Sequence, residues 1–135
     1  SARSVVTPRV EAWLRQAHSD LEVARLTAAQ GYHPQACDHA AQAAEKALKA
    51  LLVAADTKPP YSHSLPQLFE ALRGLGVDLT PLDGLLLRQL SRMGAERRYP
   101  QEEEAPIDRF DANDSVPALA TAEAVVQFAA AGLTG

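Results

Sequence analysis

The 135-residue sequence has little cysteine and no pattern typical of a membrane span or a signal peptide. Its single cysteine, Cys37, excludes a disulfide framework and indicates a reducing compartment, where a small buried side chain is the simplest interpretation. No run of about 18 apolar residues predicts a membrane span. Residues 1–8 lack the long apolar region of a signal peptide. We therefore expect a soluble, cytoplasmic protein that makes no contact with a membrane.

Positive charge and strand-forming patterns are also scarce. Acidic residues outnumber Lys and Arg by 17 to 13, which gives a formal net charge of -4. Proteins that coat nucleic acid carry the opposite balance, so any contact with nucleic acid should be local. No segment alternates with a period of two for long enough to predict a strand. The sequence therefore predicts an all-α protein.

Helix start and stop signals divide the chain into an up-and-down bundle of four to five helices. Thr7-Pro8 and Ser64-Leu65-Pro66 are start signals, because a capping hydroxyl precedes a proline in the first turn. Thr80-Pro81 repeats this signal, and Asp114 or Ser115 caps the last helix, with Pro117 in its first turn. The expected helices cover residues 8–30, 34–56, 65–74, 81–98 and 115–133, with an irregular segment at 99–113.

The second of these helices is apolar on more than one face. At about 100° per residue, its apolar residues between 36 and 55 cover an arc of roughly 200°, twice that of an ordinary surface helix. We expect this helix at the centre of the bundle, in contact with other helices or with a second subunit. Phe128 should project away from the inner face of the last helix. These two surplus apolar surfaces predict a homodimer.

In the fourth expected helix, apolar residues recur along one side and basic residues along another. The apolar side consists of Leu82, Leu86, Leu90 and Met93. The basic residues Arg92, Arg97 and Arg98, followed by Tyr99, are candidates for binding a phosphate, with Lys46 and Lys49 as lesser contributors. Alternatively, Glu96 and residues 102–104 neutralise these arginines in structural ion pairs.

His63 is the histidine best placed for chemistry. It lies where a proline-rich loop meets the start of a helix, and exposed N–H groups at such a position favour anions. The alternative interpretation is that Ser62 or Ser64 caps the helix while His63 packs against the preceding loop. The other histidines and Cys37 lack the spacing of zinc ligands, so we predict no metal and no cofactor.

Three segments resemble motifs of one family. Residues 40–51 look like its Gln-Ala-x-Glu-Lys-x-x-Lys central helix, and residues 62–65 followed by Leu68 are similar to its Thr-His-x-Leu segment. Residues 98–100 match the Arg-Tyr-Pro that ends the fourth helix in one prokaryotic branch. The family is the HEPN family, the higher eukaryote and prokaryote nucleotide-binding helical bundles. The likeness covers about residues 8–133 of what we expect to be a single domain, 1–135.

The resemblance implies a dimeric bundle that works beside a minimal nucleotidyltransferase in a two-gene, toxin-antitoxin-like system. Many members are metal-independent RNases with an arginine followed after four to six residues by a histidine. No arginine in this sequence has a histidine in that window. We therefore expect no catalytic residue, and a module that binds a nucleotide, an RNA or the nucleotidyltransferase. The alternatives are an RNase that uses His63 with Arg92, Arg97 or Arg98, and a purely structural dimerisation bundle.

Overall fold

The computed structural model is an all-α bundle and describes residues 5–96 and 103–134. No β-strand is formed within these ranges, which confirms the predicted fold class. The elements are α1 (Pro8–Ala29), α2 (His33–Ala54), α3 (Leu65–Gly74), the 3-10 helix η1 (Thr80–Leu82), α4 (Leu87–Glu96), α5 (Pro106–Arg109) and α6 (Ala112–Thr134).

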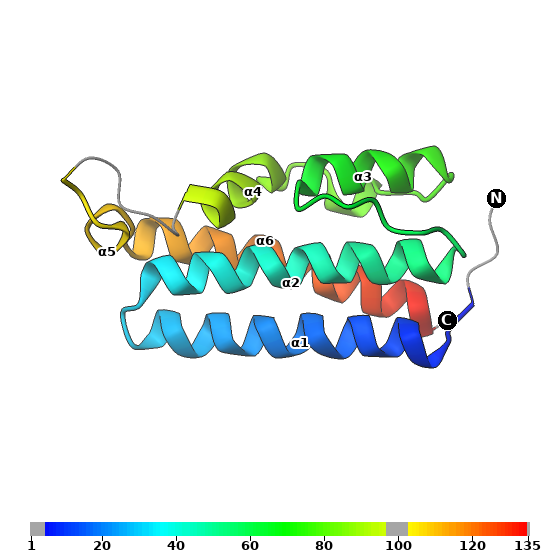
Figure 1. Ribbon diagram of the computed structural model, residues 1–135, viewed down its shortest axis with the longest axis horizontal. Helices are drawn as coiled ribbons and strands as arrows, with labels where there is room; N and C mark the ends of the chain where they lie inside the picture. Colours follow the sequence, from blue (N-terminus) through cyan, green and yellow to red (C-terminus); the bar gives the residue numbers. More distant parts are fainter. Residues whose placement is uncertain (1–4, 97–102, 135) are drawn as a thin grey trace.

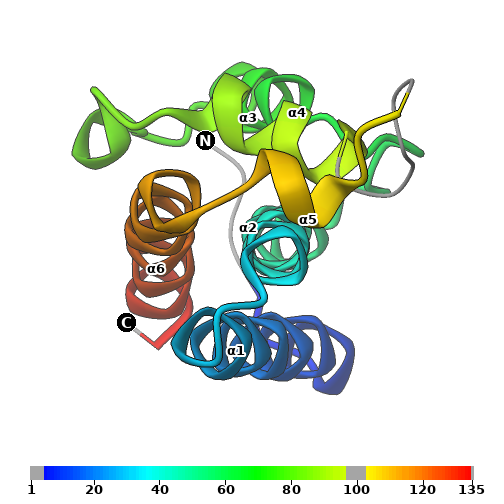
Figure 2. The same ribbon diagram turned by 90° about the vertical axis from the view of Figure 1, so that its left-hand side faces the viewer.

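Helix α2 lies at the centre of the molecule. The long helices α1, α2 and α6 run side by side, and the shorter α3 and α4 cover the opposite side of α2 (Figures 1 and 2). The apolar residues of α2 are buried on more than one face of the helix. Ala43 and Ala50, for example, have no exposed surface. A single chain therefore covers the surface from which the sequence predicts a second subunit. The homodimer itself stays a prediction.

Cys37, on α2, is fully buried in the core. Burial, and to a lesser degree the charge of Asp114, raises the pKa of the Cys37 thiol to about 12. The thiol is therefore protonated at neutral pH and lacks the thiolate that a nucleophile needs. Cys37 contributes to packing as a small apolar side chain.

The predicted starts of the first and third helices are confirmed. The Thr7 hydroxyl accepts a hydrogen bond from the Val10 N–H at 3.3 Å, and the Ser64 hydroxyl accepts one from the Gln67 N–H at 3.4 Å. In both helices the residue at or next to the first position is proline, which needs no hydrogen-bond acceptor there.

The predicted start of the fourth helix at Thr80 is wrong. That signal begins only the short helix η1, because Asp83 is extended, with a φ of -61° and a ψ of 141°, and Gly84 follows in a left-handed conformation with a φ of +83°. Helix α4 starts afresh at Leu87. This break shifts the register, so Leu87 is buried in place of Leu86, which is 52% exposed.

The last helix also starts earlier than predicted. Asp111 is its cap: the Asp111 carboxylate accepts from the Asn113 N–H, and the Asp114 carboxylate accepts from the Asp111 N–H. Pro117 therefore lies inside α6 and not in its first turn. Ser115 has another role, since its buried hydroxyl lies 2.8 Å from His33 Nδ1. The segment predicted to be irregular contains α5.

Helix α6 is long and apolar enough to span a membrane by length and composition, although the sequence was expected to contain no membrane span. Core helices pass the same test, and α6 packs against α1, α2 and α4. Its side chains Val125 and Val126 are fully buried. Phe128, predicted to project outward, is partly buried against the core. In this fold α6 is a core helix of the bundle.

Candidate functional site

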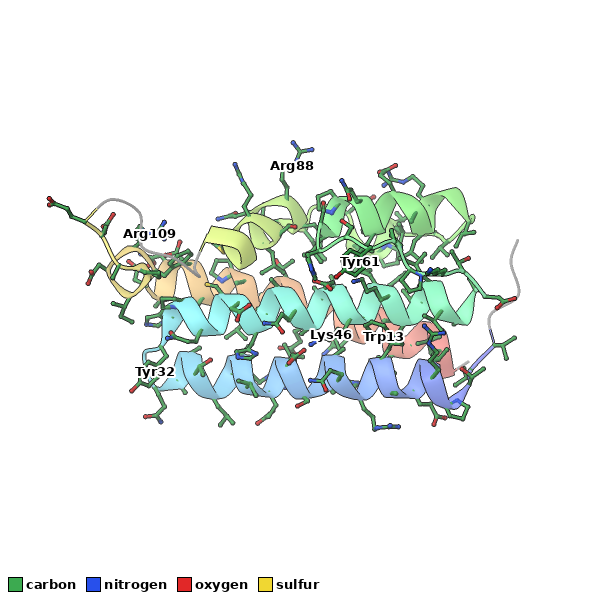
Figure 3. The ribbon with its side chains drawn as sticks, in the orientation of Figure 1. Trp13, Tyr32, Lys46, Tyr61, Arg88 and Arg109 are labelled. Atoms are coloured by element: carbon green, nitrogen blue, oxygen red, sulfur yellow. The ribbon has the colours of Figure 1, made fainter. Side chains whose placement is uncertain are left out.

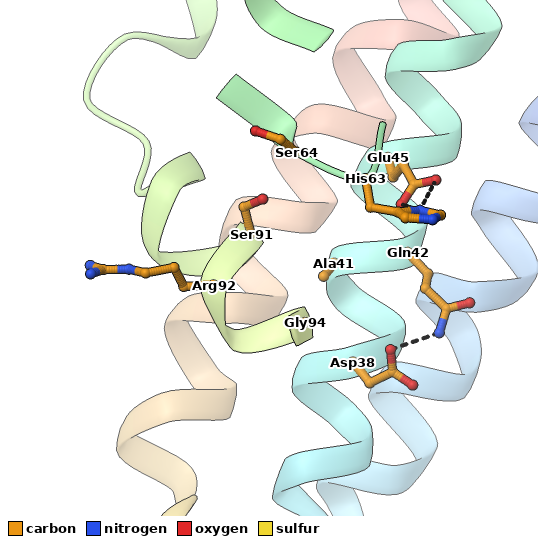
Figure 4. A pocket seen from close by; sticks show the side chains of 9 residues that line it. All are labelled: Asp38, Ala41, Gln42, Glu45, His63, Ser64, Ser91, Arg92 and Gly94. Carbon is orange, nitrogen blue, oxygen red and sulfur yellow. Dashed lines mark hydrogen bonds and ion pairs between the residues drawn. The ribbon is translucent and has the colours of Figure 1, made fainter. Parts of the chain in front are cut away.

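A cleft of about 360 Å³ opens between α2, α4 and the residues that precede α3 (Figure 4). The two helices touch at Ala41 and Gly94, where a methyl group on residue 94 would lie 2.8 Å from Ala41 Cβ. This contact closes one side of the cleft. The lining residues are Asp38, Ala41, Gln42, Glu45, His63, Ser64, Ser91, Arg92 and Gly94.

His63 is fixed in the cleft by Glu45. Its Nδ1 lies 3.0 Å and 3.1 Å from the two carboxylate oxygens of Glu45, so Nδ1 carries the proton and donates it to them. The His63 side chain is 79% exposed, whereas that of Glu45 is 12% exposed. In a neutral imidazole bonded in this way, Nε2 is the basic nitrogen. Among the described residues, His63 pairs with this carboxylate and not with an arginine.

Glu45 also binds Lys49, which lies under the cleft and not in it. Lys49 Nζ is 2.9 Å from Glu45 Oε2 and 5.9 Å from the centre of the Trp13 ring. The side chains of Glu45 and Lys49 are only 12% and 10% exposed. Burial of both charges makes this pair sensitive to the loss of either partner.

Two serines hold the start of α3 against its neighbours. The Ser91 hydroxyl, from α4, accepts a hydrogen bond from the Leu65 N–H at 3.1 Å. The Ser62 hydroxyl accepts from the Ser64 N–H at 3.1 Å and donates to the Gln67 side chain at 2.6 Å. Together with the His63–Glu45 pair, these bonds attach the connection between α2 and α3 to both walls of the cleft.

Arg92 supplies the positive charge on the α4 wall. Its exposed side chain extends from α4 away from α2, so that the guanidinium points away from the space between the two helices (Figure 4). It also borders a neighbouring hollow of about 300 Å³, which is lined in part by Arg109 and Asp114. The described lining of the cleft is therefore mixed in charge, with Asp38 and Glu45 on α2 and Arg92 on α4.

The structure brings together two of the residues predicted from the sequence, His63 and Arg92. Lys46 does not line this cleft; it pairs with the buried carboxylate of Asp20 on α1 at 2.5 Å, and Lys49 pairs with Glu45. The other predicted residues, Arg97, Arg98 and Tyr99, lie outside the described residues.

Sequence reasoning missed three polar residues on the α2 wall. Asp38, Gln42 and Glu45 are spaced four and three residues apart, so they share one helix face. The Gln42 amide donates to Asp38 Oδ1 at 2.7 Å. The sequence indicates that this face of the helix is polar. It does not indicate that the connection before α3 folds back over this face.

Two further observations bear on where a ligand can bind. A second cleft, of about 380 Å³, lies at the end of α2 and is lined by Arg9 and Lys58 together with Val53, Asp56, Thr57 and Pro59. Within residues 5–96 and 103–134, no three His, Cys, Asp or Glu side chains come together as a metal site would require.

Two solved structures have the same fold. TT1696 from Thermus thermophilus superposes with a TM-score of 0.84 and 26% identity, over 94% of this chain and 100% of that one. ST0689, an archaeal HEPN homologue, gives a TM-score of 0.71 and 26% identity, over 93% of this chain and 98% of that one. No curated protein matches the chain.

The model of the HEPN domain matches residues 10–132. That span contains the central helix, the His63 segment and the whole cleft between α2 and α4. The protein belongs to the HEPN domain family.

Proposed function

We propose that this protein is a non-catalytic HEPN module that binds a nucleotide or the end of an RNA in the cleft between α2 and α4. The observation that carries this proposal is a cleft of about 360 Å³ that is lined by the imidazole of His63 and by residues of α4 that include Arg92. Small-molecule sites in proteins have volumes of about 300 to 1,000 Å³, so a nucleotide fits this size.

The mixed charge of the cleft suits a ligand that has both a charged phosphate and neutral polar groups. The exposed side chain of Arg92 can hold a phosphate once it rotates toward the cleft, since a guanidinium binds phosphate oxygens in pairs. Asp38 and Gln42 on the α2 wall offer hydrogen-bond partners for ribose hydroxyls or base edges. The side of the cleft that is formed by the small residues Ala41 and Gly94 offers an apolar surface. A phosphate alone would use only the first of these features.

The sequence supports binding over cleavage, because the arginine–histidine pair of the nuclease members is missing from it. A homodimer and a minimal nucleotidyltransferase partner stay predictions from the family resemblance.

We expect Arg92→Ala to weaken nucleotide binding by about 10- to 100-fold, since hydrogen bonds to charged groups contribute about 1.5–3 kcal/mol. Titration calorimetry at two salt concentrations measures this. The loss of one phosphate contact should also lower the salt dependence of binding by about one charge. The control is Arg88→Ala, which removes an exposed arginine one turn earlier that does not line the cleft (Figure 3). Equal affinities of wild type and Arg92→Ala would remove this site.

A second candidate function is metal-independent RNA cleavage, favoured by the bond between His63 Nδ1 and Glu45. That bond leaves Nε2 as a base held in a fixed orientation. Nε2 would take the proton of a ribose 2′-hydroxyl, whose oxygen attacks the neighbouring phosphorus. The 5′-oxygen would leave and take a proton from water, which produces a 2′,3′-cyclic phosphate.

For this candidate, His63→Ala should lower cleavage measured in the presence of a chelator by about 10²- to 10⁴-fold, the usual contribution of a general base. His18→Ala is the control, because His18 is an exposed residue of α1 outside the cleft. Chelator-resistant cleavage that depends on His63 would replace the binding module with an enzyme. The binding module predicts that wild type does not cleave.

A further inference from the structure

Tyr61 is an aromatic side chain held fully in solvent beside the cleft. Its exposed fraction is 105%, against 55% for Tyr32. Tyr61 lies on the connection between α2 and α3, whereas Tyr32 lies at the turn between α1 and α2 (Figure 3). Burying an aromatic ring of this size stabilises a protein by about 1.5–3 kcal/mol, and Tyr61 contributes none of that to the bundle.

The backbone around Tyr61 is nevertheless well fixed. The Ser62 N–H donates to the Pro60 carbonyl at 2.7 Å, which makes a three-residue turn with Tyr61 at its centre. Pro59 and Pro60 restrict the φ angles ahead of the turn. On the other side, His63 is bonded to Glu45. The turn therefore presents the ring in solvent at little cost in conformational entropy.

The position of Tyr61 in the chain places its backbone close to the cleft. Two residues of extended chain span at most about 7 Å, so the Cα of Tyr61 lies within that distance of the Cα of His63, which lines the cleft. An exposed ring on a fixed turn is what proteins use to stack an unpaired nucleobase, since every base has an aromatic face.

We propose that Tyr61 stacks on the base of a nucleotide bound in the cleft between α2 and α4, so that the ligand is a nucleotide with an unpaired base, either free or at a single-stranded RNA end. This inference rests on the proposed function. A base inside a duplex has both faces covered by its neighbours, so single strands bind in preference to duplexes. Stacking tolerates all four bases, so sequence preference is weak.

The test compares wild type, Tyr61→Ala, Tyr61→Phe and Tyr32→Ala. The probes are a short single-stranded oligoribonucleotide, measured by fluorescence anisotropy, and pyrophosphate, which has no base, measured by calorimetry. Tyr61→Ala should weaken RNA binding by about 5- to 150-fold, the equivalent of about 1–3 kcal/mol per stacked base, and leave pyrophosphate binding unchanged. Tyr61→Phe and Tyr32→Ala should bind RNA as wild type does.

Three outcomes overturn the inference, and they are distinguishable. If wild type binds the oligoribonucleotide and Tyr61→Ala binds it equally well, Tyr61 does not stack, while the proposed function stands. If wild type binds neither probe, the proposed function fails and the stacking role fails with it. Equal loss of RNA and pyrophosphate binding in Tyr61→Ala also overturns stacking, because the ring would then act on the cleft and not on a base.

Discussion

Glu45→Ala should lower the free energy of unfolding by about 3 kcal/mol, because it leaves the buried ammonium of Lys49 without its carboxylate. Removal of one partner of a buried ion pair typically costs about 3–5 kcal/mol, and the slight exposure of this pair favours the lower end. Denaturation by urea, followed by circular dichroism, measures the change. His63 loses its partner in the same variant, so ligand binding should weaken as well.

Two comparisons separate the buried charge from other causes. Lys49→Met in the Glu45→Ala background removes the unpaired ammonium and should recover most of the loss. Glu70→Ala breaks an exposed pair with Arg73 and should cost no more than about 0.5 kcal/mol. A loss in Glu45→Ala as small as that in Glu70→Ala would contradict the burial argument.

Gly94→Ala should also destabilise the protein, by about 1–3 kcal/mol, although glycine-to-alanine changes inside helices usually stabilise by about 1 kcal/mol. The new methyl group would lie 2.8 Å from Ala41 Cβ, which cannot move without the backbone of α2. Helix α4 must therefore shift away from α2, and the cleft between them changes shape. Thermal unfolding and nucleotide titration measure the two consequences.

Gly74→Ala provides the matched control, since a methyl group there meets no atom within 4 Å at the end of α3. Its stability should equal or slightly exceed that of wild type. Ala41→Gly, combined with Gly94→Ala, removes the opposing methyl group and should restore most of the contact. A more stable Gly94→Ala protein would show that α2 and α4 are not in close contact.

The starts of α1 and α3 could be predicted because their signals are local. Thr7 and Ser64 each cap a helix through a hydroxyl three residues from its partner, and both starts are confirmed. Thr80 gives the same local signal, but an extended Asp83 and a left-handed Gly84 interrupt the helix. Whether Gly84 continues a helix or ends it depends on how the segment packs against the bundle, which the local pattern does not contain.

The site could be predicted only in part because its partners are distant in sequence. The position of His63 at a helix start made it a candidate, but Glu45 lies 18 residues earlier on another helix. Lys49 was expected to contribute to ligand binding because it is one of the basic residues nearest the sequence motifs. The fold buries the side chains of Lys49 and Glu45. The polar face of α2 forms one wall of the cleft, and Glu45 on that face pairs with His63 just before the start of α3.

The most direct test of the central claim is a titration of the isotope-labelled protein with a mononucleotide, followed by amide chemical shifts. The account predicts that the shifts concentrate on His63, Ser64, Ser91 and Arg92, which line the cleft between α2 and α4. The amides of the second cleft, at Arg9 and Lys58, should not move. Shifts confined to Arg9 and Lys58, or no shifts at millimolar nucleotide, would contradict the claim that this HEPN protein binds nucleotides between α2 and α4.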